Sequence, residues 1–351
     1  FEINQLSSGT GIQNKEISAV YNIVRNEYLV VWQSCTDGNY DLKGALVSAQ
    51  GITVQGYTDT VISAEASMEL NPSLVFKQSA IAGDIDEYVI AYDEYSSNKW
   101  LPGIRRINPE TLQTIGYTQF NSQNNVKHPD IAYARNVQRY ILTYWQNSSS
   151  SGSNISCAIL DINLSQLNQK DITSFSLNMP ESYPKTASGM TTINGSNYLS
   201  YLVIWDDYRN DALGDIYYNV IDINGNPVGV NNVLAGGTGY QMMQDVKSNP
   251  VTQSFLASWV DRKNAFDNGK INASILGTNY SDAALGKLDT LTIAVAGNET
   301  YNVRPHIASA NNTKYGGYAV VWTERDFVKQ TRKTRLQITD SDGYPTGAPF
   351  L

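Results

Sequence analysis

The sequence has little charge, little histidine or cysteine, and no long apolar run. Charged residues make up only 17% of its 351 positions, below the roughly 25% of an average soluble protein. The net charge is −8 and no basic stripe is visible. This argues against nucleic acid as a partner, because phosphate binding needs clustered Lys and Arg. No run of about 18 apolar residues occurs, so the sequence predicts no membrane span.

What the sequence does contain is a repeat of short apolar segments, each ending in an aromatic residue. The six terminal aromatic residues lie 60, 53, 60, 54 and 63 positions apart. The segments are 28–32, 88–92, 140–145, 201–205, 255–259 and 318–322. A strand-rich repeat of this length indicates an array of small sheets rather than one continuous core. Six copies, with no long helical periodicity, predict an all-β chain that folds as a single six-bladed β-propeller domain over residues 1–351.

The last repeat shows how one blade is expected to be built. Residues 305–309 form a short first strand, and Tyr318–Trp322 form an apolar second strand that neighbouring blades cover on both faces. Residues 334–339 alternate polar and apolar side chains, as a strand farther out in the blade should. A turn at 340–343 leads to the start of a fourth strand. Each blade is therefore predicted to be a four-stranded antiparallel sheet.

The N-terminal segment Phe1–Leu6 precedes the first strand of the first repeat and has the pattern of an outermost strand. We expect it to pair with the sixth blade and close the ring, since closure removes an open sheet edge and ties distant parts of the chain together. The alternative is that this segment pairs with another subunit, which would allow self-assembly into a filament or surface layer.

The fourth repeat carries the clearest motif. Trp205-Asp-Asp-Tyr-Arg209 is followed by Asp215-Ile-Tyr217 and by Asn224-Gly-Asn-Pro-Val-Gly229, in which Asn-Gly is a strong hairpin signal. This arrangement resembles the repeats of secreted and surface-attached bacterial and archaeal β-propellers, and the resemblance extends over the chain as six divergent copies. It implies the propeller architecture and an extracellular or cell-surface location. It specifies no activity, because such propellers serve many roles.

The loops that follow the aromatic-ended strands should gather on one rim of the ring. A concave rim rich in carboxylates, arginines and tyrosines could hold a sugar or a peptide. The candidate ligand-binding residues are Asp93, Asp206, Asp207, Tyr208, Arg209, Asp261, Arg262, Glu324 and Arg325. An Asp or Arg at such a place can equally cap a turn or pair with the next blade. The six terminal aromatic residues are expected to pack between blades rather than to stack on sugars.

No catalytic motif stands out from the sequence. A glycosidase needs two carboxylates that face each other, and Asp93, Asp207, Asp261 and Glu324 are available, but the sequence assigns no catalytic residue. No nucleophile elbow, P-loop or zinc motif occurs.

Metal and disulfide chemistry also find little support. Oxygen ligands alternate at 37–41, which would suit Ca²⁺, but a solvated turn is the preferred interpretation, so no cofactor and no metal site are predicted. Cys35 and Cys157 lie in different repeats and are expected to be unpaired.

The sequence favours a non-catalytic extracellular propeller that binds or adheres to a glycan or a protein surface through its loop rim. Divergent repeats, a low-charge surface rich in Tyr and Asn, and the lack of a recognisable catalytic constellation support this interpretation, which leans away from an enzyme. Two alternatives remain open. One is a glycoside hydrolase or lyase with a carboxylate pair at the channel mouth. The other is a structural subunit of a surface layer or extracellular filament.

Overall fold

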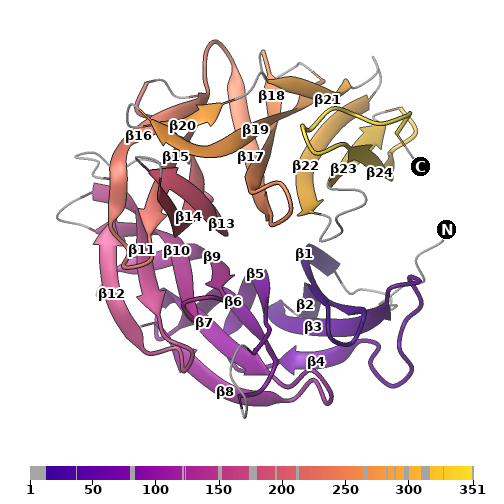
Figure 1. Cartoon of the computed structure of the whole chain (residues 1–351). Coiled ribbons are helices and arrows are strands. Elements are labelled where there is room, and N and C mark those ends of the chain that lie inside the picture. The colour runs from indigo at the N-terminus through magenta and orange to yellow at the C-terminus, as the bar shows by residue number, and fades with distance from the viewer. Residues whose placement is uncertain are drawn as a thin grey trace. The chain divides into compact units, whose positions relative to one another are not determined.

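The computed structural model of the chain consists of β-strands joined by turns and loops (Figure 1). It describes residues 13–36, 38–79, 84–120, 122, 124–148, 152–173, 180–193, 196–210, 213–263, 268–281, 284–287, 290–295, 300–309, 317–326 and 328–349. Within these ranges there is no helix, and hence none that could cross a membrane. The described residues form two compact units, of which the first ends at Gln169 and the second begins at Lys170. The single-domain expectation stays a prediction.

The first unit contains three antiparallel sheets, each made of four strands that are consecutive in the chain. The first sheet comprises β1 (Gln13–Asn22), β2 (Glu27–Thr36), β3 (Asn39–Ser48) and β4 (Thr60–Ser63). The second comprises β5 (Met68–Lys77), β6 (Glu87–Ser96), β7 (Lys99–Ile107) and β8 (Thr114–Gln119). The third comprises β9 (Asn125–Ala134), β10 (Arg139–Ser148), β11 (Gly152–Leu160) and β12 (Gln166–Asp171).

The second unit continues the series with three more sheets. The fourth comprises β13 (Lys185–Ile193), β14 (Ser196–Asp207), β15 (Asp215–Asp222) and β16 (Pro227–Ala235). The fifth comprises β17 (Tyr240–Asn249), β18 (Ser254–Arg262) and β19 (Lys270–Ser281), with β20 (Ala284–Lys287) and β21 (Leu291–Val295) both paired to β19. A short parallel pairing also joins β13 to β19. The sixth comprises β22 (Thr300–Ser309), β23 (Tyr318–Asp326) and β24 (Thr331–Thr339).

Six successive antiparallel blades, of which the fourth and fifth are joined into one sheet by the β13–β19 pairing, confirm the predicted all-β, six-bladed β-propeller. The described part of the sixth blade has three strands. The segment Phe1–Leu6, which was expected to complete this blade and close the ring or to mediate self-assembly, lies outside the described residues.

The aromatic-ended segments form the second strand of every blade. Their terminal residues are Trp32, Tyr92, Trp145, Trp205, Trp259 and Trp322, and none is more than 5% exposed. Each compact unit contains apolar layers between neighbouring sheets rather than one central core. Packing between blades is therefore the role of these aromatic residues, as the sequence predicted.

The first strand of five blades contains a bulge at which one residue that is not glycine adopts a positive φ, between 36° and 57°. These residues are Glu16, Asn71, His128, Met243 and Arg304. A bulge inserts an extra residue that leaves the ladder and re-aims the chain. Because the inserted residue lacks its ladder partner, its backbone N–H needs another acceptor. Asp93 supplies such an acceptor to the bulge residue His128.

Candidate functional site

Asp93 follows the terminal aromatic residue of β6 and is 1% exposed. Its Oδ1 accepts the backbone N–H of the bulge residue His128 at 2.7 Å, and its Oδ2 accepts Asn71 Nδ2 at 2.7 Å. Gln33, at the same position in the first sheet, accepts the backbone N–H of Asn71 at 3.1 Å. Burial raises the pKa of the Asp93 carboxyl. Asp93 therefore links the second blade to the third through His128.

Asp207 binds two other residues of the fourth blade, Trp205 and Arg209, and we call these three residues the clasp. Its side chain is fully buried, and its Oδ2 accepts Trp205 Nε1 at 2.9 Å and Arg209 Nη2 at 2.6 Å. Its Oδ1 accepts both the backbone N–H and Nε of Arg209, at 3.0 and 2.9 Å. The Arg209 guanidinium also lies over the Tyr217 ring, 4.5 Å from its centroid. These charge-assisted hydrogen bonds hold Asp207 and Arg209 together as an ion pair.

The two remaining candidates of the fourth blade are also largely buried. Asp206 is 5% exposed, and burial raises its pKa to about 7. Hydrogen bonds from the Tyr183 backbone and the Gln244 side chain lower the pKa, but by less than burial raises it. Tyr208 is half-buried, and burial raises its pKa to about 12. Asp206 is therefore a carboxyl group that changes protonation near neutral pH.

The two arginine candidates of the fifth and sixth blades meet at Tyr301 on β22. Arg262 at the end of β18 and Arg325 on β23 place their guanidinium carbons 5.5 and 5.4 Å from the centroid of this ring. Arg325 Nη1 donates to the Tyr301 hydroxyl at 2.8 Å. Glu324, the neighbour of Arg325, forms an ion pair with Arg335 at 2.8 Å.

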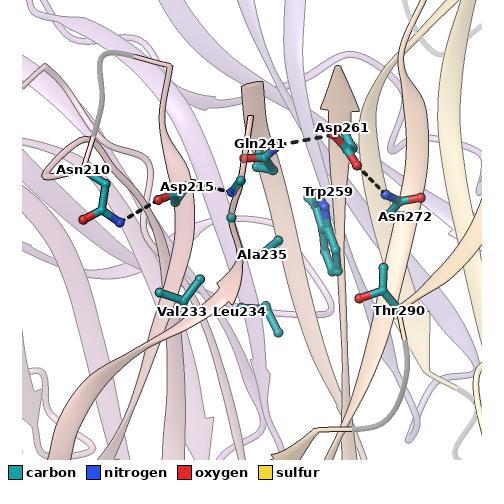
Figure 2. Close-up of a pocket in the computed structure, with 12 residues that line it drawn as sticks. Asn210, Asp215, Val233, Leu234, Ala235, Gln241, Trp259, Asp261, Asn272 and Thr290 are labelled. Atoms are coloured by element: carbon teal, nitrogen blue, oxygen red, sulfur yellow. Dashed lines mark hydrogen bonds between the residues drawn. The ribbon is translucent and has the colours of Figure 1, made fainter. Parts of the chain in front are cut away.

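Asp261 lines a cavity of about 430 Å³ that lies between the fourth and fifth sheets, within the second unit. The fourth sheet contributes the loop residue Asn210, the first residue of β15, Asp215, and residues 233–237. The fifth contributes Gln241, Trp259, Asp261, Asn272 and Thr290. In Figure 2 the two carboxylates stand on opposite sides of the view, with Gln241 between them. A volume of this order is within the range of small-molecule sites.

Neutral amide groups hold both carboxylates of the cavity. Asp215 accepts Asn210 Nδ2 at 2.9 Å and the Gly237 backbone N–H at 3.3 Å. Asp261 accepts Gln241 Nε2 at 3.2 Å and Asn272 Nδ2 at 2.9 Å. No ion pair involves either of them within the described part of the chain, in contrast to Asp207. Oriented but not neutralised, they can act on a ligand electrostatically or by proton transfer.

Two further features shape the cavity. Trp259 is only 1% exposed, so it forms a wall rather than a stacking surface. Gln241 is 4% exposed, and its Oε1 is a buried acceptor with no hydrogen-bond partner among the described residues. A bound molecule that reaches this region with a hydroxyl group would relieve an unsatisfied acceptor.

Sequence reasoning found Asp261 but missed the rest of the cavity. Asp215 belongs to the motif Asp215-Ile-Tyr217, which indicated architecture only. Its position directly before a third strand, opposite Asp207 in the register of β14 and β15, is the one signal that could have pointed to it. Gln241 and Asn272 carry no such signal, because amide residues are abundant throughout the chain.

Metal ligands do not gather anywhere in the described ranges, where no group of three or more His, Cys, Asp or Glu side chains is placed to hold an ion. The 37–41 segment considered for Ca²⁺ includes Asp37, which lies outside those ranges. Neither Cys35 nor Cys157, both of which are described, forms a disulfide, as predicted.

Solved structures with the same fold come from several organisms. An α-L-arabinofuranosidase from Fusarium graminearum, in complex with an iminosugar inhibitor, matches with a TM-score of 0.58 and 9% identity over 93% of each chain. A Penicillium chrysogenum α-L-arabinanase complexed with arabinobiose matches with a TM-score of 0.58 and 8% identity over 93% of each chain. Kuenenia stuttgartiensis hydrazine synthase matches with a TM-score of 0.50 and 14% identity, over 93% of this chain and 76% of its own.

Likeness at such low identity shows the fold. No protein-family model matches the sequence, and no curated protein matches it. The structural matches nevertheless overturn our leading sequence-based interpretation, a non-catalytic binding or adhesion propeller.

Proposed function

We propose that the protein is a glycoside hydrolase, and that the Asp215–Asp261 cavity holds the sugar it cleaves. The observation that carries this proposal is the presence of two carboxylates, contributed by two neighbouring blades, on one cavity of about 430 Å³. Hydrolysis of a glycosidic bond needs one carboxyl group that donates a proton and a second that acts as base or nucleophile. Asp215 and Asp261 supply such a pair.

The surroundings of the pair suit a polyhydroxylated ligand. The cavity lining includes the amides of Asn210, Gln241 and Asn272, which both donate and accept hydrogen bonds. The unpartnered Oε1 of Gln241 adds an acceptor. A sugar offers hydroxyl groups in the number and spacing that such a lining requires.

The fold likeness suggests where the substrate assay should start. The arabinofuranosidase and the arabinanase share the propeller fold with this chain, so α-L-arabinofuranosyl polymers are the first substrates to test. A polysaccharide substrate also fits our sequence-based expectation of an extracellular or cell-surface protein.

The direct test is the release of reducing ends from arabinan and from a panel of other polysaccharides. We expect the unmodified protein to release products, and the Asp261→Asn variant to lose at least about 100-fold in rate, as expected when an acid, base or nucleophile is removed. Asp261 is half-buried, and both of its oxygens accept amide N–H groups, so the Asp261→Asn variant sets one NH2 donor against another. Rotation of the Gln241 amide brings its unpartnered Oε1 to the new donor, so the melting temperature should fall only slightly.

Glu324→Gln is the matched control. It also exchanges a carboxylate for an amide after an aromatic-ended strand, but Glu324 pairs with Arg335 away from the cavity. This variant should retain activity. Absence of products from every polysaccharide, or equal activity of the Asp261→Asn variant and the unmodified protein, would refute the proposal.

A further inference from the structure

Three arginines form a row on one face of the sixth blade and its neighbour. Arg325 on β23 lies directly opposite Tyr301 on β22 and directly opposite Arg332 on β24. Residues directly opposite in antiparallel strands project from the same face of the sheet. Arg262 of β18 approaches the same Tyr301 ring from the fifth blade. We call Arg262, Arg325 and Arg332 the arginine row.

The arginine row has no carboxylate partner within the described part of the chain. Among the described residues, none of its three members forms an ion pair, although other arginines do, such as Arg209 with Asp207 and Arg335 with Glu324. Within the described ranges, Arg325 donates a hydrogen bond to the Tyr301 hydroxyl and to no carboxylate. In a chain with a net charge of −8, three neighbouring cations with no carboxylate partner among the residues that the structure describes are unexpected.

Like charges at this separation repel. Arg262 and Arg325 share one ring, so their guanidinium carbons lie within about 11 Å of each other. The screening length at physiological salt is roughly 8 Å, so repulsion between them is only partly screened. Arg332, directly opposite Arg325, adds a like-charge cross-strand pair, which is destabilising in a sheet. A bound anion would convert this repulsion into attraction.

The arginine row adjoins the cavity of the proposed active site. Asp261 and Arg262 are consecutive residues of β18, and successive side chains of a strand project to opposite faces. Asp261 therefore lines the cavity shared with the fourth blade, while Arg262 meets Tyr301 of the sixth. A glycan that crosses the end of β18 passes from one site to the other.

We propose that the arginine row binds the anionic group of an acidic glycan, a carboxylate or a sulfate ester, and that the substrate of the neighbouring cavity is therefore a charged polysaccharide. Guanidinium groups present paired N–H donors that match both kinds of oxyanion. The ring of Tyr301 holds two of the guanidinium groups in place through cation–π contacts. This proposal rests on the proposed glycosidase function for its substrate, but binding is measured without turnover.

The test measures the affinity of the full chain for four ligands: an oligogalacturonate, a chondroitin sulfate oligosaccharide, a neutral arabino-oligosaccharide and a single-stranded oligonucleotide. We expect one of the two acidic glycans to bind at least ten-fold more tightly than the neutral one, with affinity that falls as salt is added. The Arg262→Gln/Arg325→Gln variant should lose about 10- to 100-fold of that affinity, as expected for charge-assisted hydrogen bonds.

The matched control is Arg335→Gln, since Arg335 already pairs with Glu324 and lies outside the row. It should bind like the unmodified chain. Equal affinity for neutral and acidic glycans, equal losses in both variants, or preferential binding of the oligonucleotide would overturn the proposal. Binding and cleavage are measured separately, so the two hypotheses can fail separately. If acidic glycans bind through the arginine row, also in the Asp261→Asn variant, but the unmodified chain cleaves no polysaccharide, only the glycosidase function fails.

Discussion

Replacement of Asp207 by alanine tests whether this residue is structural or functional. From the sequence, Asp207 and Asp261 were equivalent candidates for a catalytic carboxylate. In the structure Asp207 accepts four hydrogen bonds, one from Trp205 Nε1 and three from Arg209. Its loss should therefore lower the stability of the fourth blade rather than act on chemistry alone.

The size of the effect follows from what is left behind. Trp205 is fully buried, so its indole N–H would lose its only partner among the described residues, at a cost of about 1–3 kcal/mol. Breaking a fully buried ion pair costs about 3–5 kcal/mol, but the Arg209 side chain is 34% exposed and can turn to water. We therefore expect a total loss of about 3 kcal/mol. For a unit of this size, that corresponds to a fall in melting temperature of roughly 6–12 °C.

Thermal and urea unfolding of Asp207→Ala, Arg209→Ala and the double variant would measure this. If Asp207 and Arg209 interact as described, the sum of the unfolding free energies lost in the two single variants should exceed the loss in the double variant. The difference, which is the coupling energy, should be about 1–3 kcal/mol. The Asp261→Asn variant, which disturbs no ion pair, serves as the reference. A fall of less than 2 °C for Asp207→Ala, or additive losses in the cycle, would refute the structural role given to Asp207.

Two further predictions concern burial. The pKa of Asp206 is about 7 in the fold, above its ordinary value of 3.8, so the folded state binds the proton more tightly. Its contribution to stability should be greatest below about pH 4 and decline as the pH rises to about 7. Asp206→Asn should remove this decline, and urea unfolding at pH 4, 6 and 8 would show whether it does. Gly103→Ala places a methyl group 2.5 Å from Cζ of the buried Tyr92 and should cost about 1–3 kcal/mol. Gly116→Ala meets only the flexible Arg106 side chain, at 3.2 Å, and should be nearly neutral in the same assay.

The fold could be predicted from the sequence because its dominant signal is local and repeated. Each second strand is a short apolar run with a terminal aromatic residue, so Tyr201–Trp205 alone identifies a strand covered on both faces. The same expectation was wrong for Tyr318–Trp322, in which Ala319 and Val321 are only partly buried. The bulges of the first strands were not predicted, since Met243 and Arg304 are not residue types that favour a positive φ.

The candidate site could be predicted only in part because its chemistry depends on partners distant in the sequence. Asp207 and Asp261 each follow an aromatic-ended strand. They differ because Arg209 neutralises the first, while Gln241 and Asn272 only orient the second. Asp215 reaches the cavity from the start of a third strand. No periodicity in the sequence distinguishes these cases.

The layered packing within each unit has a consequence for how such a chain evolves. The larger apolar layers are each shared by two neighbouring sheets, as the cluster of Leu202, Val220 and Trp259 is by the fourth and fifth. A change of side-chain volume in one layer is then compensated within that layer alone. After duplication of an ancestral blade, the copies are free to drift apart in sequence while the ladder and the terminal aromatic persist. Strong divergence of the loops, and hence of chemistry from one blade to the next, is the natural result of this modular packing.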